Sequence, residues 1–138
     1  MLVLVEVLVN QNKMKSLLTI TALLEGATGL ALAFIPSLLV SILLGTALTD
    51  PTAILISRLA GGALITIAMA CWLTRSDPHS YVMVKAMAGY NIFSIALLVY
   101  AALVKKIYGP GLWPAVLLHL VLLIWCLLSM RKRVRKVI

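Results

Sequence analysis

The stretch TITALLEGATGLALAFIP, Thr19–Pro36, decides the fold because it is mostly apolar and nearly long enough to cross a bilayer as a helix. Such a helix needs roughly 20 consecutive apolar residues. The stretch belongs to a run at about 17–35, and three further runs follow at about 52–73, 82–104 and 112–130. The sequence therefore predicts an all-α integral membrane protein, a bundle of four transmembrane helices.

The composition supports this fold class. The chain has 138 residues, of which 63% are hydrophobic and only 12% are charged, and a soluble domain of this size has too much surface to hide so many apolar side chains. The four spans use nearly the whole chain, so we expect no separate soluble domain. We expect an N-terminal cytoplasmic segment at residues 1–16, a transmembrane domain at 17–130 and a basic tail at 131–138. Met14 would make a natural translation start, so we expect residues 1–13 to be either a start-site artefact or a short extra strand or helix.

The net charge of +8 follows the ends of the apolar runs rather than one basic face. Nucleic acid is therefore not an expected partner. If the spans alternate in direction, most of the positive residues fall on one side, which the positive-inside rule assigns to the cytoplasm. We expect both chain termini there. The residues concerned are Lys13, Lys15, Arg75, Lys85, Arg131, Lys132, Arg133, Arg135 and Lys136, with Lys105 and Lys106 on the other side.

Shorter signals lie between the first and second spans. PSLLVSILLG, Pro36–Gly45, is too short to cross a membrane and predicts a short interfacial or re-entrant helix. Asp50 followed by Pro51 is typical of a helix start.

Small residues at four-residue spacing predict close helix packing, within the bundle or in a homodimer. Trp72 and Trp125 fall near the inner rim, as an interfacial aromatic belt predicts.

Four polar residues fall inside the spans, where an unpaired charge is costly: Glu25, Arg58, Asn91 and His119. At a rise of 1.5 Å per residue, Glu25 and Asn91 lie roughly 12 Å above the cytoplasmic boundary of the membrane. Arg58 and His119 lie roughly 10 Å below the outer boundary of the membrane. The simplest hypothesis is that Glu25 pairs with Arg58, and that Asn91 and His119 complete the network.

Two interpretations of these residues stay open. The network can be structural and fix the register of the bundle. Alternatively, Glu25 takes up and releases a proton, or binds a cationic or hydrogen-bonding ligand, with His119 as a second titratable group. Tyr90 is next to Asn91 near mid-membrane, so its hydroxyl needs an internal partner or a ligand. The candidate ligand-binding or proton-binding residues are Glu25, Arg58, Tyr90, Asn91 and His119.

Other site chemistry has little support in the sequence. Cys71 and Cys126 have no further Cys or His neighbours to complete a metal site, so we expect them to be small apolar core residues without a disulfide. His119 would be an isolated haem ligand, because His79 falls in a cytoplasmic loop. No nucleophile motif, phosphate loop or dinucleotide fingerprint is present. We therefore expect no catalytic residues and assign no cofactor.

Two family resemblances bear on function. EGATGLALAFIPSLLVSILLG followed by RLAGGALITIAMACW resembles the DoxX-like group of small four-helix bacterial membrane proteins, which implies a multi-pass fold in the bacterial inner membrane. Some members of that group are associated with sulfur-compound or quinone-linked redox complexes. The glutamate in the first helix is similar to that of the small multidrug resistance family, whose carboxylate exchanges protons for cationic drugs. This chain lacks that family's aromatic residues around the site.

The sequence thus predicts an accessory inner-membrane protein that joins partner subunits or binds a small lipophilic molecule such as a quinone. One alternative is a proton-coupled transporter of small cations or amphiphiles that uses Glu25. Another is a quinone-linked redox subunit whose cofactor comes from a partner. The expected surroundings are the lipid bilayer, partner subunits or a second copy of the chain.

Overall fold

The fold is entirely helical across residues 2–134, the part of the chain whose backbone the computed structural model describes; side chains are described for residues 11–130. The five helices are α1 (Leu2–Phe34), α2 (Pro36–Leu44), α3 (Pro51–Thr74), α4 (Ser80–Leu103) and α5 (Leu112–Val134). Four of them have segments long and apolar enough to cross a membrane, namely Gln11–Phe34, Pro51–Thr74, Ser80–Leu103 and Leu112–Met130. The predicted all-α class with four apolar helices is confirmed. The side chains of residues 1–10, which belong to the predicted segment at 1–16, and of the predicted tail at 131–138 lie outside the described ones.

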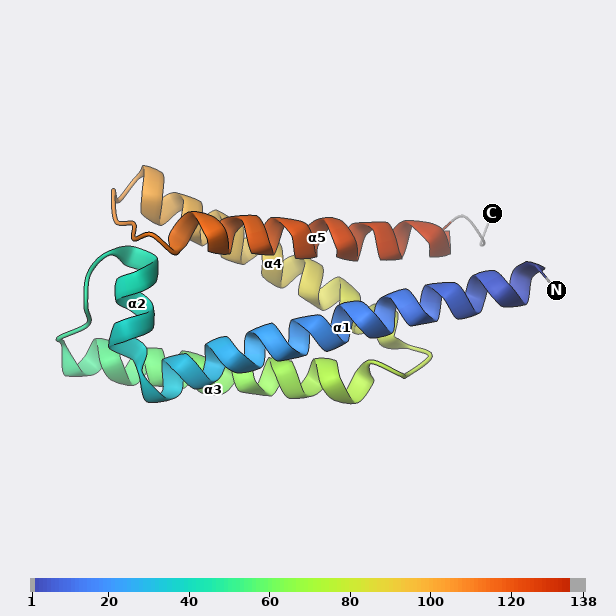
Figure 1. Ribbon diagram of the computed structural model, residues 1–138, viewed down its shortest axis with the longest axis horizontal. Helices are drawn as coiled ribbons and strands as arrows, with labels where there is room; N and C mark the ends of the chain where they lie inside the picture. Colours follow the sequence, from blue (N-terminus) through green and yellow to red (C-terminus); the bar gives the residue numbers. More distant parts are fainter. Residues whose placement is uncertain (1, 135–138) are drawn as a thin grey trace.

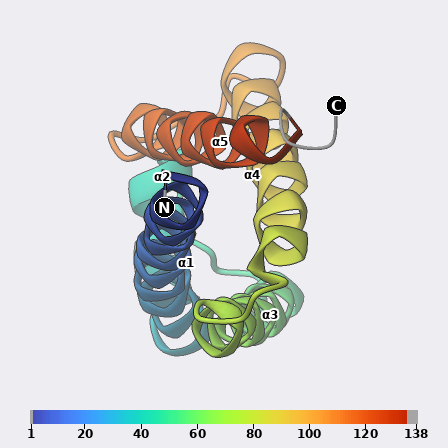
Figure 2. The same cartoon turned by 90° about the vertical axis from the view of Figure 1, so that its right-hand side faces the viewer.

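The long helices form two pairs. Helix α1 packs most extensively against α3, and α4 packs against α5, whereas fewer contacts join the two pairs. Figure 2 shows this arrangement end-on, with α1 beside α3 and α5 beside α4. The start of α1 and the end of α5 lie at the same end of the molecule (Figure 1). We call this the inner end, and the opposite end, where α2 lies across the long helices, the outer end.

Glycine lets α1 and α3 approach each other closely. A Cβ added at Gly29 would lie 2.8 Å from the carbonyl oxygen of Gly61, and one added at Gly61 would lie 2.6 Å from the carbonyl oxygen of Gly29. Nearer the inner end, a Cβ at Gly26 would make an ordinary contact with Ala68, at 3.6 Å. Small residues permit such backbone contact between helices in lipid. The predicted role of the small residues in packing within the chain is therefore confirmed for α1 and α3.

Helix α2 is held by the connection between α4 and α5. It ends at Leu44, and its C-cap residue Gly45 has a left-handed φ of 77° and an N–H that donates to the carbonyl of Ser41. The N–H of Gly109 donates to the carbonyl of Leu43 at 2.8 Å, and the N–H of Gly111 donates to that of Ile42 at 2.9 Å. The last carbonyls of a helix need such donors. The outer ends of the two helix pairs are thus joined through α2.

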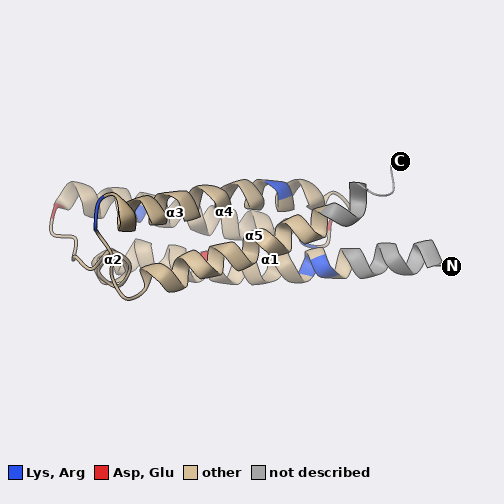
Figure 3. Ribbon diagram, turned by 90° about the horizontal axis from the view of Figure 1, so that it is seen from above, with Lys and Arg blue, Asp and Glu red and all other residues tan. Residues whose placement is uncertain are grey.

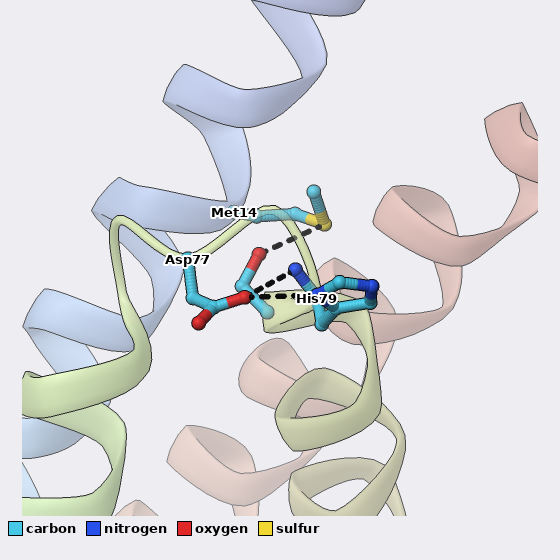
Figure 4. A network of polar contacts seen from close by, with 4 residues as sticks. Met14, Asp77 and His79 are labelled. Carbon is cyan, nitrogen blue, oxygen red and sulfur yellow. Dashed lines mark hydrogen bonds and ion pairs between the residues drawn. The ribbon is translucent and has the colours of Figure 1, made fainter.

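Side-chain hydrogen bonds stabilise the start of α3 and the connection from α3 to α4. The Asp50 carboxylate accepts a hydrogen bond from the N–H of Ala53 at 2.8 Å, which confirms the predicted helix start. Figure 4 shows the inner connection, where the Asp77 carboxylate accepts from the backbone N–H of His79. The Ser80 hydroxyl lies 3.9 Å from the Met14 sulfur, so the start of α4 contacts α1.

The main core lies toward the inner end and is built of side chains from α1, α3, α4 and α5. Its fully buried members include Leu17, Leu18, Cys71 and Val84. Blue Lys and Arg segments lie toward the ends of the helices, whereas the middle is almost entirely tan (Figure 3). The bundle therefore presents an apolar middle in which any polar side chain needs an internal partner.

Candidate functional site

A carboxyl group is buried between the two helix pairs. Glu25 lies on α1 and is only 4% exposed. The hydroxyl of Tyr90, on α4, donates a hydrogen bond to Oε2 of Glu25 at 2.9 Å. Since α1 and α4 belong to different helix pairs, this bond joins one pair to the other. The sequence required an internal partner or a ligand for the Tyr90 hydroxyl, and the structure provides Glu25 as that partner.

A second polar pair joins α4 to α5. The Asn91 side chain is fully buried, and its Nδ2 donates to the carbonyl of Met87 at 2.7 Å. Its Oδ1 lies 2.8 Å from Nδ1 of His119. Because the amide nitrogen of Asn91 is already a donor, Oδ1 is the acceptor and His119 carries a hydrogen on Nδ1. In the neutral ring, Nε2 of His119 is then left as an acceptor.

The two pairs form one unit, which we call the polar cluster: Glu25, Tyr90, Asn91 and His119. The rings of Tyr90 and His119 meet edge to face, with centroids 5.7 Å apart and planes at 72°. Tyr90 and His119 are half-buried, whereas Glu25 and Asn91 are buried. Three helices thus hold four of the five predicted site residues together.

The polar cluster retains unused bonding atoms. Among the described side chains, Oε1 of Glu25 has no hydrogen-bond partner and neither does Nε2 of His119. No cation pairs with Glu25 among residues 11–130, where the one ion pair joins His79 to Asp77. A carboxyl group and an imidazole that share one apolar site can hold a proton or bind a polar group of a ligand.

Arg58 lies outside the polar cluster, so the proposed pairing with Glu25 is wrong for this structure. Arg58 is exposed on α3. Ala68, which faces Gly26 and so marks the level next to Glu25, is ten residues further along α3. This spacing corresponds to about 15 Å of helix, more than an arginine side chain can span.

The expected link between Asn91 and His119 is present. The sequence placed Asn91 nearer the inner side of the membrane and His119 nearer the outer side, and expected both residues to complete one network. Nδ1 of His119 lies 2.8 Å from Oδ1 of Asn91, so the two side chains join α4 to α5. Leu112 and Ala102 share one core cluster, which places the start of α5 beside the end of α4.

We expect a double-mutant cycle to separate the true partner of Glu25 from the excluded one. Glu25→Gln and Tyr90→Phe should show a coupling energy of about 0.5 to 1.5 kcal/mol, the range for hydrogen bonds between transmembrane helices. Glu25→Gln and Arg58→Gln should be additive within about 0.5 kcal/mol. The free energy of unfolding in mixed micelles gives both values. A larger coupling of Glu25 to Arg58 than to Tyr90 would contradict the structure.

The two cysteines, Cys71 and Cys126, lie in the core outside the polar cluster, as expected for small apolar residues. Both are buried and free. Among the described residues, no three His, Cys, Asp or Glu side chains are close enough together to hold a metal ion. Sequence reasoning did not identify Thr21, which lies one turn before Glu25 and is 1% exposed. Its four-residue spacing from Glu25 is the signal that could have found it.

No family model, curated protein or solved structure matches this chain. The resemblance to the DoxX-like group therefore stays a prediction. The fold and site themselves define a class: a small helical protein with four apolar helices that fit a multi-pass membrane protein, and with a polar cluster buried between its two helix pairs.

Proposed function

We propose that this protein binds a small lipophilic molecule with a hydrogen-bonding head group, such as a quinone, at the polar cluster. The observation that carries the proposal is the unused bonding capacity of Glu25 and His119 beside Tyr90, inside an otherwise apolar bundle. Binding sites for small molecules commonly combine an apolar lining with a few convergent polar groups. A head group that bonds to these atoms would offset the cost of leaving them unpaired.

The chemistry of the cluster suits a head group that carries carbonyl or hydroxyl oxygens. A hydroxyl on the ligand donates to Nε2 of the neutral His119 ring, and a carbonyl accepts from a protonated Glu25, whose Oε2 already accepts from the Tyr90 hydroxyl. The sequence offers no catalytic motif, so we propose an accessory role alongside partner subunits. A redox role would require a cofactor that a partner donates.

The proposed setting is the bacterial inner membrane, in line with the resemblance to the DoxX-like group. The four apolar helices would cross the bilayer as a bundle, with both chain termini in the cytoplasm as the positive charges near the inner end favour. Helix α2 would then lie in the outer interface.

A second candidate is proton-coupled transport of small cations. It is supported by the lack of a cationic partner for Glu25 among the described residues. A transported cation could take that place, and its binding would displace a proton from the carboxyl group. Proton release from the purified protein on addition of a lipophilic cation, absent in Glu25→Gln, would favour transport over the binding of a neutral lipophile.

The test of the leading proposal is the affinity of the purified protein for a short-chain quinone. We expect Tyr90→Phe to raise the Kd about five-fold, because the variant loses the hydrogen bond that orients the Glu25 carboxyl toward the ligand, and one hydrogen bond contributes about 1 kcal/mol. Tyr100→Phe is the matched control, since Tyr100 lies on the same helix and is 47% exposed. His119→Gln is paired in the same way with His79→Gln. Equal affinities for wild type, Tyr90→Phe and His119→Gln, or no quinone binding at all, would contradict the proposal.

A further inference from the structure

An apolar groove separate from the polar cluster runs along α1 and α3. It has a volume of about 330 Å³, at the small end of the range of about 300 to 1,000 Å³ for ligand pockets. It opens outward, because Leu23, Met69 and Leu73 on its walls are more than half exposed. Its lining is entirely apolar or aromatic, and the residues used below are Ala22, Gly26, Ala68 and Trp72.

The inner end of this groove carries positive charge. The Arg75 guanidinium lies 3.5 Å from the ring centroid of Trp72, and its Nη1 donates to the Trp72 carbonyl. Arg75 pairs with no carboxylate among residues 11–130; Asp77, two residues on, bonds to His79 instead. The Arg75 guanidinium therefore lies over the Trp72 ring at the inner end of the groove. Its remaining N–H groups can donate to an anion.

A second cation, Lys15, lies on the neighbouring helix toward the same end of the groove. Gly26 faces Ala68, and seven residues further toward the inner end on each helix are Thr19 and Arg75. Lys15, exposed and one turn beyond Thr19, lies on the same side of α1 as Ala22 of the groove wall, because seven residues make almost two full turns. The cations of α1 and α3 thus bracket one end of an apolar channel.

We propose that this groove binds one anionic phospholipid. Its acyl chain lies between α1 and α3, and its phosphate lies at Arg75 and Lys15. Basic pockets beside transmembrane helices on the cytoplasmic side suit anionic head groups. A second copy of the chain fits less well, because copies inserted in the same direction and docked symmetrically would bring their Arg75 and Lys15 side chains together. Like charges so placed repel each other.

Lipid titration of the full chain in neutral detergent, followed by native mass spectrometry, tests the charge component. We expect phosphatidylglycerol to form one adduct in preference to phosphatidylcholine. Arg75→Gln should reduce that preference about five-fold. Lys105→Gln is the control, because Lys105 lies over the Tyr100 ring at the outer end in a similar way. Equal binding of the two lipids by the wild-type protein would overturn the proposal.

Filling the groove tests its apolar component. Gly26→Leu should abolish the adduct, whereas Gly62→Leu should keep it, because Gly62 has open space around it. Protection of Cys71 and Cys126 from maleimide shows that each variant is folded. A dimer that Gly26→Leu dissociates, or an adduct that Gly26→Leu retains, would overturn the proposal. If Gly26→Leu does not fold, the preference of Arg75→Gln for phosphatidylglycerol over phosphatidylcholine still tests the proposal. Because Tyr90→Phe leaves the groove intact, it should not change the adduct.

Discussion

Replacement of Gly61 by leucine is expected to force α1 and α3 apart and to destabilise the protein by about 3 kcal/mol or more. A Cβ at this position would lie 2.6 Å from the carbonyl oxygen of Gly29 and 2.7 Å from the backbone nitrogen of Ala33. Both neighbours are backbone atoms of a helix, so neither can move without the helix. At the adjacent Gly62, an added Cβ would have no neighbouring atom within 4 Å, and Gly62→Leu should have little effect.

Labelling of the two cysteines measures this difference. Cys71 and Cys126 are at most 1% exposed and are the only cysteines in the sequence, so a maleimide reacts with them once the packing opens. We expect Gly61→Leu to be labelled at a much lower SDS mole fraction than the wild-type protein. Equal labelling of Gly61→Leu and Gly62→Leu would mean that α1 and α3 are not in backbone contact.

The second large effect is expected at Gly109, where alanine should release the connection between α4 and α5 from helix α2. A Cβ there would clash with the carbonyl oxygen of Ile42 and would lie 2.7 Å from the nitrogen of Gly45 and 2.9 Å from the carbonyl oxygen of Ser41. We expect a loss of about 2 kcal/mol, typical of overpacking against groups that cannot move aside. Gly89→Ala, at a position with open space, is the control.

Hydrogen exchange reports this second effect locally. The N–H groups of Gly109 and Gly111 donate to carbonyls of α2 in the native structure. In Gly109→Ala both amides should exchange at least about ten-fold faster, since 1.4 kcal/mol corresponds to a factor of ten. Unchanged protection of residues 109–111 would show that α2 is held by something other than these bonds.

The fold could be predicted in large part because its strongest signals are local. Helix length, apolar composition and the Pro36, Gly45 and Asp50 boundary residues all act within a few residues of the chain. Transmembrane length follows directly from bilayer thickness. What these signals could not supply is the relative height of the helices, which depends on contacts such as Gly29 to Gly61 between distant parts of the chain.

The candidate site was predictable as a set of residues but not as a set of bonds. Glu25, Asn91 and His119 stood out because polar groups are costly in lipid. Their partners depend on heights and on the direction of each side chain, so Arg58 was wrongly paired with Glu25, and Tyr90 took that position instead. Opposite charge alone suggested an ion pair between Glu25 and Arg58. The packing provides instead a hydrogen bond from the neutral Tyr90 side chain to the acidic Glu25 side chain.

The most direct measurement is native mass spectrometry of the protein extracted gently from its own membrane, with an optical spectrum of the same sample. The account predicts one bound lipophile with a quinone-type absorbance, retained by Tyr100→Phe and reduced by Tyr90→Phe and by Glu25→Gln. A phospholipid in the α1 and α3 groove would instead be retained in all three variants. A protein that carries no such lipophile, or carries it equally in every variant, would contradict the proposed role of the polar cluster.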